Sequence, residues 1–150
     1  MDTIDHRIVG ALSRAARQTL QELAHHVHLG ASATRERLRR LEAAGIITGY
    51  RAVLDADRLG FPFDALVEVD LPAGADAAAF EAGLRATPAV VEAVHATGDR
   101  DYLVRLRCRD KSELNRVVHG LKRELGAART ETRVVLDQPV PARDRLPDVR

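Results

Sequence analysis

The chain has 150 residues, 45% of them hydrophobic and 30% charged, which predicts one large or two small globular domains and excludes a disordered chain. A formal net charge of +1 excludes a uniformly basic coat for nucleic acid, and no apolar run approaches the roughly 18 residues of a membrane span. The single cysteine, Cys108, excludes an internal disulfide framework, and the N-terminus lacks the basic region of a signal peptide. We therefore expect a cytoplasmic protein that does not enter a membrane.

Residues 1–60 predict one domain that consists of three helices and a linking strand. The apolar face of the first predicted helix consists of Ile4, Ile8, Val9 and Leu12. Thr19 and Glu22 have the spacing of a capping box, which predicts that a second helix begins there. A turn over residues 28–30 leads to a third helix from about Ala31 to Ala44, which Gly45 ends. The following residues, 46–54, are expected to be extended.

Residues 61–150 predict a second domain with the order β-α-β-β-α-β, the ferredoxin-like arrangement. The expected strands cover residues 65–71, 89–96, 102–108 and 130–136. Asp76 is expected to cap the first helix of this domain and Ser112 the second. The tail, residues 137–150, carries three prolines and is expected to be loosely held. The predicted fold class is α+β, with an N-terminal winged helix-turn-helix domain and a C-terminal ferredoxin-like domain.

The second and third predicted helices follow a leading helix and are joined by a three-residue turn, which is the plan of a helix-turn-helix motif. If Thr34, Leu38 and Leu41 face inward, the opposite face of the third helix points toward the major groove of DNA. That face consists of Ser32, Arg35, Glu36, Arg39, Arg40 and Ala43. Arg37 is expected at the edge of the buried stripe, within reach of a phosphate. Arginine suits both guanine edges and phosphates, but a solvated face with arginines paired to Glu36 and Glu42 is the alternative.

Two segments resemble the Lrp/AsnC, or feast/famine, family of bacterial transcription regulators. VHLGASATRERLRRLEAAGIITGY, residues 27–50, resembles the recognition-helix signature of that family, as does TLQELAHHV before it. VHATGDRDYLVRLRC, residues 94–108, resembles its regulatory half, and TETRVVL resembles its last strand. The resemblance covers nearly the whole chain. It implies a DNA-binding N-terminal domain and a C-terminal domain that dimerises and senses amino acids.

Two positions depart from the family pattern. His28 stands in the turn where the family usually has Gly, and a left-handed conformation at that position costs a histidine roughly 1 kcal/mol. Gly30 stands where the family usually has the capping Ser, a change that costs only a few tenths of a kcal/mol. Neither departure threatens the fold.

We assign two sets of candidate site residues and expect no cofactor, metal or catalytic residue. The DNA-binding set consists of Thr19, Ser32, Arg35, Arg37, Arg39 and Arg40. The effector-binding set consists of Thr97, Gly98, Asp99, Asp101, Tyr102, Thr130 and Thr132, of which the two threonines are implied only by the resemblance. Turn amides suit a carboxylate and an aspartate suits an ammonium, so the turn around Gly98 fits a free amino acid. Arg100 either pairs a carboxylate or is solvated, and a plain hairpin turn is the alternative for the whole segment.

The expected partners are double-stranded DNA, an amino-acid effector and further copies of the chain. Two helices on one face of a sheet leave the other face bare, and we expect Tyr102, Val104 and Leu106 to make that face partly apolar, so that it packs on a second copy. The resemblance extends the homodimer to an octamer. The alternatives are an architectural DNA-binding protein without amino-acid response and, less favoured, a tetrapyrrole decarboxylase of related fold. His25, His26 and His28 lack the carboxylate or cysteine that a metal site needs.

Overall fold

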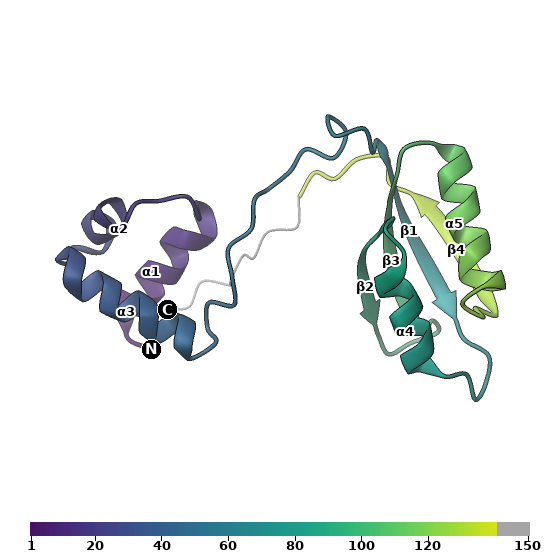
Figure 1. Cartoon of the computed structure of the whole chain (residues 1–150), viewed down its shortest axis with the longest axis horizontal. Helices are drawn as coiled ribbons and strands as arrows, with labels where there is room; N and C mark the ends of the chain where they lie inside the picture. Colours follow the sequence, from purple (N-terminus) through teal and green to yellow (C-terminus); the bar gives the residue numbers. More distant parts are fainter. Residues whose placement is uncertain (141–150) are drawn as a thin grey trace. The chain divides into compact units, whose positions relative to one another are not determined.

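The computed structural model describes residues 1–140 and separates into two units, Met1–Val53 and Leu54–Pro139, each with its own core (Figure 1). The first unit contains three helices: α1 (Thr3–Arg14), α2 (Leu20–Val27) and α3 (Ala31–Ala43). Its core consists of Ile8, Ala11, Leu23, Val27 and Leu41, with Ile4, Val9, Leu12 and Leu38 packed against them. The predicted inward faces of α1 and α3 are therefore confirmed.

Local signals at the helix ends act as the sequence predicts. The side chain of Thr19 accepts a hydrogen bond from the backbone of Glu22 while the Glu22 carboxylate accepts one from the backbone of Thr19, so the capping box is present. Gly45 follows α3 with a φ of 68° and donates to the carbonyl of Glu42, and Ile46 donates to that of Leu41. This pair of bonds is a Schellman motif, which needs the left-handed conformation that glycine adopts without strain.

The expected linking strand is not a strand in the single chain. Between Ala43 and Phe63, all of which the structure describes, no residue is assigned to a strand. A strand requires a neighbour to accept and donate its backbone hydrogen bonds, and neither unit supplies one there. The expected linking strand over residues 46–54 is therefore not formed in this chain taken alone.

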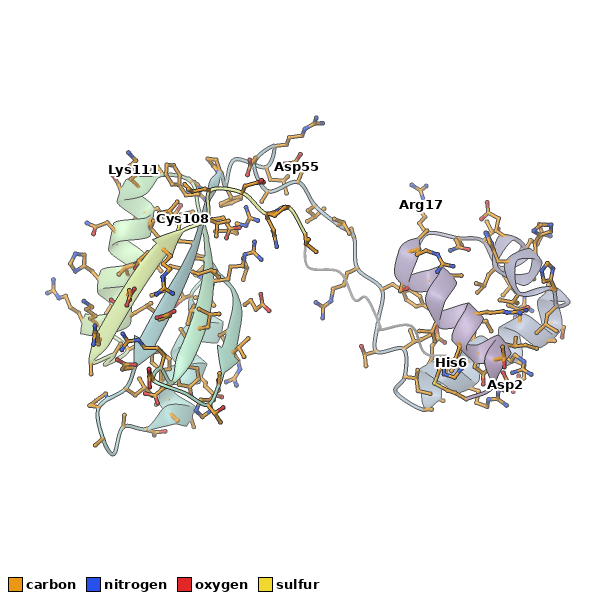
Figure 2. All side chains as sticks on the ribbon, turned by 180° about the vertical axis from the view of Figure 1, so that it is seen from behind. Asp2, His6, Arg17, Asp55, Cys108 and Lys111 are labelled. Carbon is orange, nitrogen blue, oxygen red and sulfur yellow. The ribbon has the colours of Figure 1, made fainter. Side chains whose placement is uncertain are left out.

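The second unit has the predicted order β-α-β-β-α-β, and the expected fold class is confirmed. Its elements are β1 (Phe63–Asp70), α4 (Ala77–Ala86), β2 (Val90–His95), β3 (Tyr102–Cys108), α5 (Lys111–Arg123) and β4 (Arg129–Val134). The strands form one antiparallel sheet in the order β2-β3-β1-β4, and α4 and α5 cover one face of it (Figure 1). The core between this face and the helices contains Val67, Val69, Phe80, Leu84, Val104, Leu106 and Leu121. Cys108 lies at the end of β3 in the same core (Figure 2), and burial raises the pKa of its thiol.

Two expectations about this unit are wrong. Tyr102, Val104 and Leu106 face the helices and are buried, not exposed on the bare face, because strand pairing and helix position decide which side of an alternating strand is covered. Asp110, not Ser112, caps α5: its carboxylate accepts the backbone N–H of Glu113 at 2.7 Å. Both residue types are good caps, but the carboxylate also interacts favourably with the positive end of the helix dipole. Asp76 caps α4 as predicted.

Within the described residues, no helix is long and apolar enough to cross a bilayer. The expectation of a loosely held tail falls mostly on residues 141–150, which lie outside the described part of the chain.

Candidate DNA-binding surface and effector loop

A tight turn between α2 and α3 places α3 on the surface of the first unit. His28 ends α2 in the left-handed region, with φ 56° and ψ 45°, and is the one non-glycine residue with positive φ among those described. Gly30 begins α3 without a side-chain cap. His28 thus adopts the left-handed conformation that the family pattern implies, and Gly30 lacks a side-chain cap as expected.

The exposed face of α3 lies opposite its buried residues. Thr34 and Leu41 are buried, and the Thr34 hydroxyl donates to the carbonyl of Gly30 at 3.0 Å. The exposed residues of the helix include Ser32, Arg35, Glu36, Arg39, Arg40 and Ala43, which is the set expected to face DNA. Thr19 is also exposed, at the start of α2, where its hydroxyl donates to the Glu22 carboxylate at 2.8 Å.

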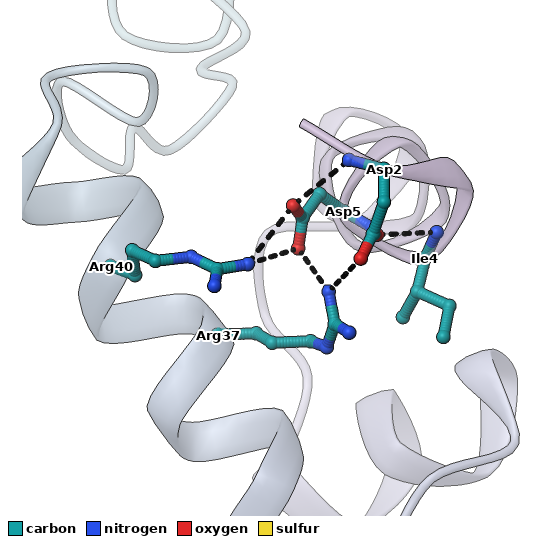
Figure 3. Close-up of polar contacts among 5 residues, drawn as sticks. All are labelled: Asp2, Ile4, Asp5, Arg37 and Arg40. Atoms are coloured by element: carbon teal, nitrogen blue, oxygen red, sulfur yellow. Dashed lines mark hydrogen bonds and ion pairs between the residues drawn. The ribbon is translucent and has the colours of Figure 1, made fainter.

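Arg37 is less exposed than the other arginines of α3. Its Nη1 donates to Asp2 at 2.6 Å and to Asp5 at 2.8 Å, and its side chain is 24% exposed (Figure 3). Asp5 is buried in the first turn of α1, and its carboxylate also accepts the Asp2 backbone N–H at 3.1 Å. Burial raises the pKa of Asp5, but the hydrogen bonds from Arg37 and from the Asp2 backbone outweigh it and leave that pKa below its ordinary value. The guanidinium of Arg37 therefore already has two partners within the unit.

The candidate effector loop joins β2 to β3. The Ala96 N–H donates to the carbonyl of Asp101 at 3.1 Å and closes the loop, and Gly98 has a φ of 135°. Thr97, Gly98 and Asp99 are exposed. This φ lies in a region that side-chain-bearing residues rarely adopt, so the loop conformation depends on a glycine at this position.

Asp101 and Arg100 are engaged by the protein itself. The Asp101 carboxylate accepts the backbone N–H of Leu71 at 2.7 Å, and the Asp101 N–H donates to the carbonyl of Val69. Arg100 reaches three carboxylates on neighbouring strands, those of Glu68, Asp70 and Glu131, with the shortest distance, 2.7 Å, to Asp70. Arg100 is therefore neither solvated nor free to pair a ligand carboxylate, and one Asp101 oxygen is already bonded.

Tyr102 is buried at the start of β3 and forms a row with its neighbours across the sheet. His95, Tyr102, Val69 and Thr130 are successive partners on β2, β3, β1 and β4. The ring of His95 stacks on Tyr102 with centroids 4.6 Å apart, and the Tyr102 hydroxyl donates to Glu81 at 3.1 Å. Burial, followed by this bond, raises the pKa of Tyr102.

The structure thus places Thr130 at the same end of the sheet as the loop, and Thr132 two residues farther along β4. A hollow of about 250 Å³ lies beside Asp101 and Tyr102, lined also by His95, Ala77 and residues 71–75. Its volume is just below the roughly 300 Å³ at which ordinary ligand pockets begin. His95 and the 71–75 segment are neighbours of the loop that sequence reasoning missed, since only strand pairing brings them there.

Comparison with known families matches both units. A winged helix-turn-helix DNA-binding model matches residues 1–48, and the Lrp/AsnC ligand binding domain matches residues 64–144, more than half of the chain. The chain belongs to the Lrp/AsnC family. It is a transcription regulator with a helix-turn-helix DNA-binding domain and an Lrp/AsnC ligand-binding domain.

Individual members of the Lrp/AsnC family are similar over almost their full length. The chain is 33% identical over 141 residues to the leucine-responsive regulatory protein of Haemophilus influenzae, which covers 92% of this chain and 85% of the relative. It is 36% identical over 138 residues to the transcriptional regulatory protein DoeX of Halomonas elongata, and the match covers 90% of this chain and 87% of the relative. The solved structure of a transcriptional regulator of Neisseria meningitidis in complex with L-Met matches with a TM-score of 0.91 at 29% identity. The match covers 98% of this chain and 96% of the other chain. These relatives are named regulators, as the recognised motifs predict.

Proposed function

We propose that this regulator binds double-stranded DNA through α3 and responds to a free amino acid that binds at the β2–β3 loop. The observation that carries the first half is the exposed face of α3, where Arg35, Arg39 and Arg40 lie opposite the buried Thr34 and Leu41. Arginine on an exposed recognition helix is suited to bidentate bonds with guanine and to phosphate contacts. Ser32 and Thr19 extend the same DNA-binding set at the starts of α3 and α2.

Three observations support an amino acid as the effector. A relative of the same fold is described in complex with L-Met. The loop around Gly98 leaves backbone groups accessible because no Cβ covers them, and the exposed Asp99 offers a carboxylate to an ammonium group. The adjoining hollow has room for a small side chain. In this proposal Thr97, Gly98 and Asp99 contact the effector, Asp101 and Tyr102 shape the site, and Thr130 and Thr132 flank it.

We further propose that the bare sheet face packs on a second copy of the chain. Leu66, Val94 and Leu103 lie on that face, among ion pairs that join β1, β3 and β4. The Asp64 carboxylate accepts from Arg105 at 2.5 and 2.9 Å and pairs with Arg107 at 3.0 Å, so these buried charges are neutralised within the chain. A face with satisfied charges and apolar residues between them is suited to a homodimer, from which an octamer would form by association of dimers.

Effector binding would then act by shifting the population of assemblies, and with it the spacing of paired α3 helices on DNA. Such a regulator acts on chromosomal DNA, so we propose that it is located in the cytoplasm. An architectural DNA-binding protein without amino-acid response remains the second candidate. A decarboxylase finds no support in relatives that are named transcriptional regulators.

A thermal-shift screen of the twenty amino acids, followed by DNA binding with and without the best of them, tests the proposal. We expect at least one amino acid to raise the melting temperature and to change the Kd for a duplex that the wild-type protein selects from a random-sequence pool. Gly98→Val should lose that response and keep the ligand-free Kd, because the substitution lies in the other unit from α3. If no amino acid changes DNA affinity or assembly, the architectural function is favoured.

A further inference from the structure

The first turn of α1 is joined to the middle of α3 by a cluster of ion pairs around the buried Asp5. Asp5 is 3% exposed, and it and Thr34 are the two buried polar residues among the described residues of the helical unit. A buried carboxylate is costly unless it is paired, and here Arg37 supplies the pair at 2.8 Å from a position 32 residues away (Figure 3). The cluster is therefore a tertiary connection between two helices.

Arg40 takes part in the cluster in a different way. Its Nη2 lies 3.2 Å from Asp5 Oδ2 and 3.3 Å from Oδ1, longer than the Arg37 bonds, and its side chain is 62% exposed. Arg37 and Arg40 lie one turn apart on α3, so one carboxylate of α1 contacts two successive turns of the helix. A contact away from the helix axis resists rotation about that axis, and a second contact one turn farther along also resists tilting of the helix.

We propose that Asp5, acting through Arg37, is a positioning residue that sets which face of α3 is presented to DNA. The hydrophobic residues of α3 alone define this rotation weakly, because the inward set is small: Thr34 and Leu41 are buried and Leu38 is partly buried. Readout of a guanine edge by a bidentate arginine depends on the direction of that arginine. Arg37 thus positions the helix and does not contact DNA. The inference rests on the proposed function in that α3 contacts DNA.

The test compares specific with non-specific binding. The probes are the duplex selected by the wild-type protein from a random-sequence pool and poly(dI-dC), and each Kd is measured at several salt concentrations. The variants are Asp5→Asn, Arg37→Gln and Arg37→Lys, all measured at temperatures at which far-UV circular dichroism shows them folded. Arg85→Gln, in an exposed ion pair of the other unit, is the matched control. Arg39→Gln reports whether α3 contacts DNA at all.

We expect Asp5→Asn and Arg37→Gln to reduce the ratio of specific to non-specific affinity about tenfold or more. Their poly(dI-dC) affinity and their salt slope should stay at the wild-type level, because no phosphate contact is lost. Arg37→Lys keeps the charge on a shorter side chain, whose ammonium cannot reach Asp2 and Asp5 from the same position as Nη1 of Arg37. Its ratio of specific to non-specific affinity should therefore be intermediate, and this variant decides the test if the other variants do not fold.

Equal losses of both affinities, an unchanged ratio, or a salt slope lowered by about one would each overturn the inference. The last outcome would make Arg37 a phosphate contact. If Arg39→Gln binds both probes like the wild type, the proposed DNA-binding face itself is wrong, which is a separate failure.

Discussion

The carboxylate of Asp101 accepts a hydrogen bond from the backbone N–H of Leu71, 30 residues earlier in the chain, at 2.7 Å. This bond connects the β2–β3 loop to the segment that follows β1, and both border the same hollow. Asp101 therefore holds together two segments that line the candidate site. A change at this residue should alter stability as well as effector binding, whereas a change at the exposed Asp99 should alter binding only.

We expect Asp101→Ala to lower the free energy of unfolding of the second unit by about 1–2 kcal/mol, since a charge-assisted hydrogen bond is lost. Its response to the effector should be lost as well. Asp99→Ala is the matched variant, with wild-type stability and a weaker response. Urea unfolding followed by circular dichroism measures the free energy of unfolding, and the effector-dependent change in Kd for DNA measures the response to the effector. Wild-type stability of Asp101→Ala would show that the bond to Leu71 is not significant in solution.

The bare sheet face gives a prediction about assembly. Leu103 is 38% exposed on that face and lies between Val94 and Glu68 on the neighbouring strands. If a second copy covers it, Leu103→Glu places an unpaired charge in the interface and should dissociate the dimer. Val134→Glu introduces the same charge at an exposed position on the helix-covered side of β4 and should not. Light scattering at micromolar concentration distinguishes the two, and a wild-type monomer would refute the interface.

His28 gives a prediction about stability. Its left-handed conformation costs a residue with a side chain about 1 kcal/mol, which glycine avoids. His28→Gly should therefore raise the free energy of unfolding of the helical unit by about that amount. His25→Gly, inside α2, should instead lower it by about 1 kcal/mol, since glycine is a poor helix former. Thermal unfolding of both variants shows whether stability rises in His28→Gly and falls in His25→Gly. A destabilised His28→Gly would mean that the His28 side chain itself stabilises the helical unit.

The Asp2 and Asp5 carboxylates make the helical unit sensitive to acid. The backbone N–H of Asp5, followed by Arg37, lowers the pKa of Asp2 from 3.8 to about 2. A carboxyl whose pKa is lower in the folded than in the unfolded state stabilises the fold above its unfolded value, and this stability is lost as the pH falls through the folded pKa. We expect the free energy of unfolding to decline between about pH 4 and pH 2. Asp2→Asn should reduce that decline, measured by urea unfolding at each pH, whereas Glu36→Gln, at an exposed position on α3, should leave it intact.

The sequence by itself determined the elements whose signals are local. The capping box at Thr19, the stop at Gly45 and the alternation in residues 102–108 all depend on neighbours within a few residues, so each was predicted correctly. The left-handed conformation of His28 was implied by the family resemblance. The family and both units followed from the motifs that these elements carry. The exposed face of α3 was also predictable, because helical periodicity fixes which residues lie opposite the buried ones.

Only the tertiary structure decided which side of an element meets which neighbour. The alternating sequence of β3 gives the strand an apolar face and a more polar face. Pairing with β1 and the positions of α4 and α5 determine that the face containing Tyr102 is the buried one. The partners of Arg37, Arg100 and Asp101 lie 30 or more residues away, so no local pattern distinguishes them from solvated or ligand-binding residues. Residues 46–54 lack a strand partner for a related reason, since the hydrogen bonds of an extended segment come from a second strand, and its own sequence does not specify one.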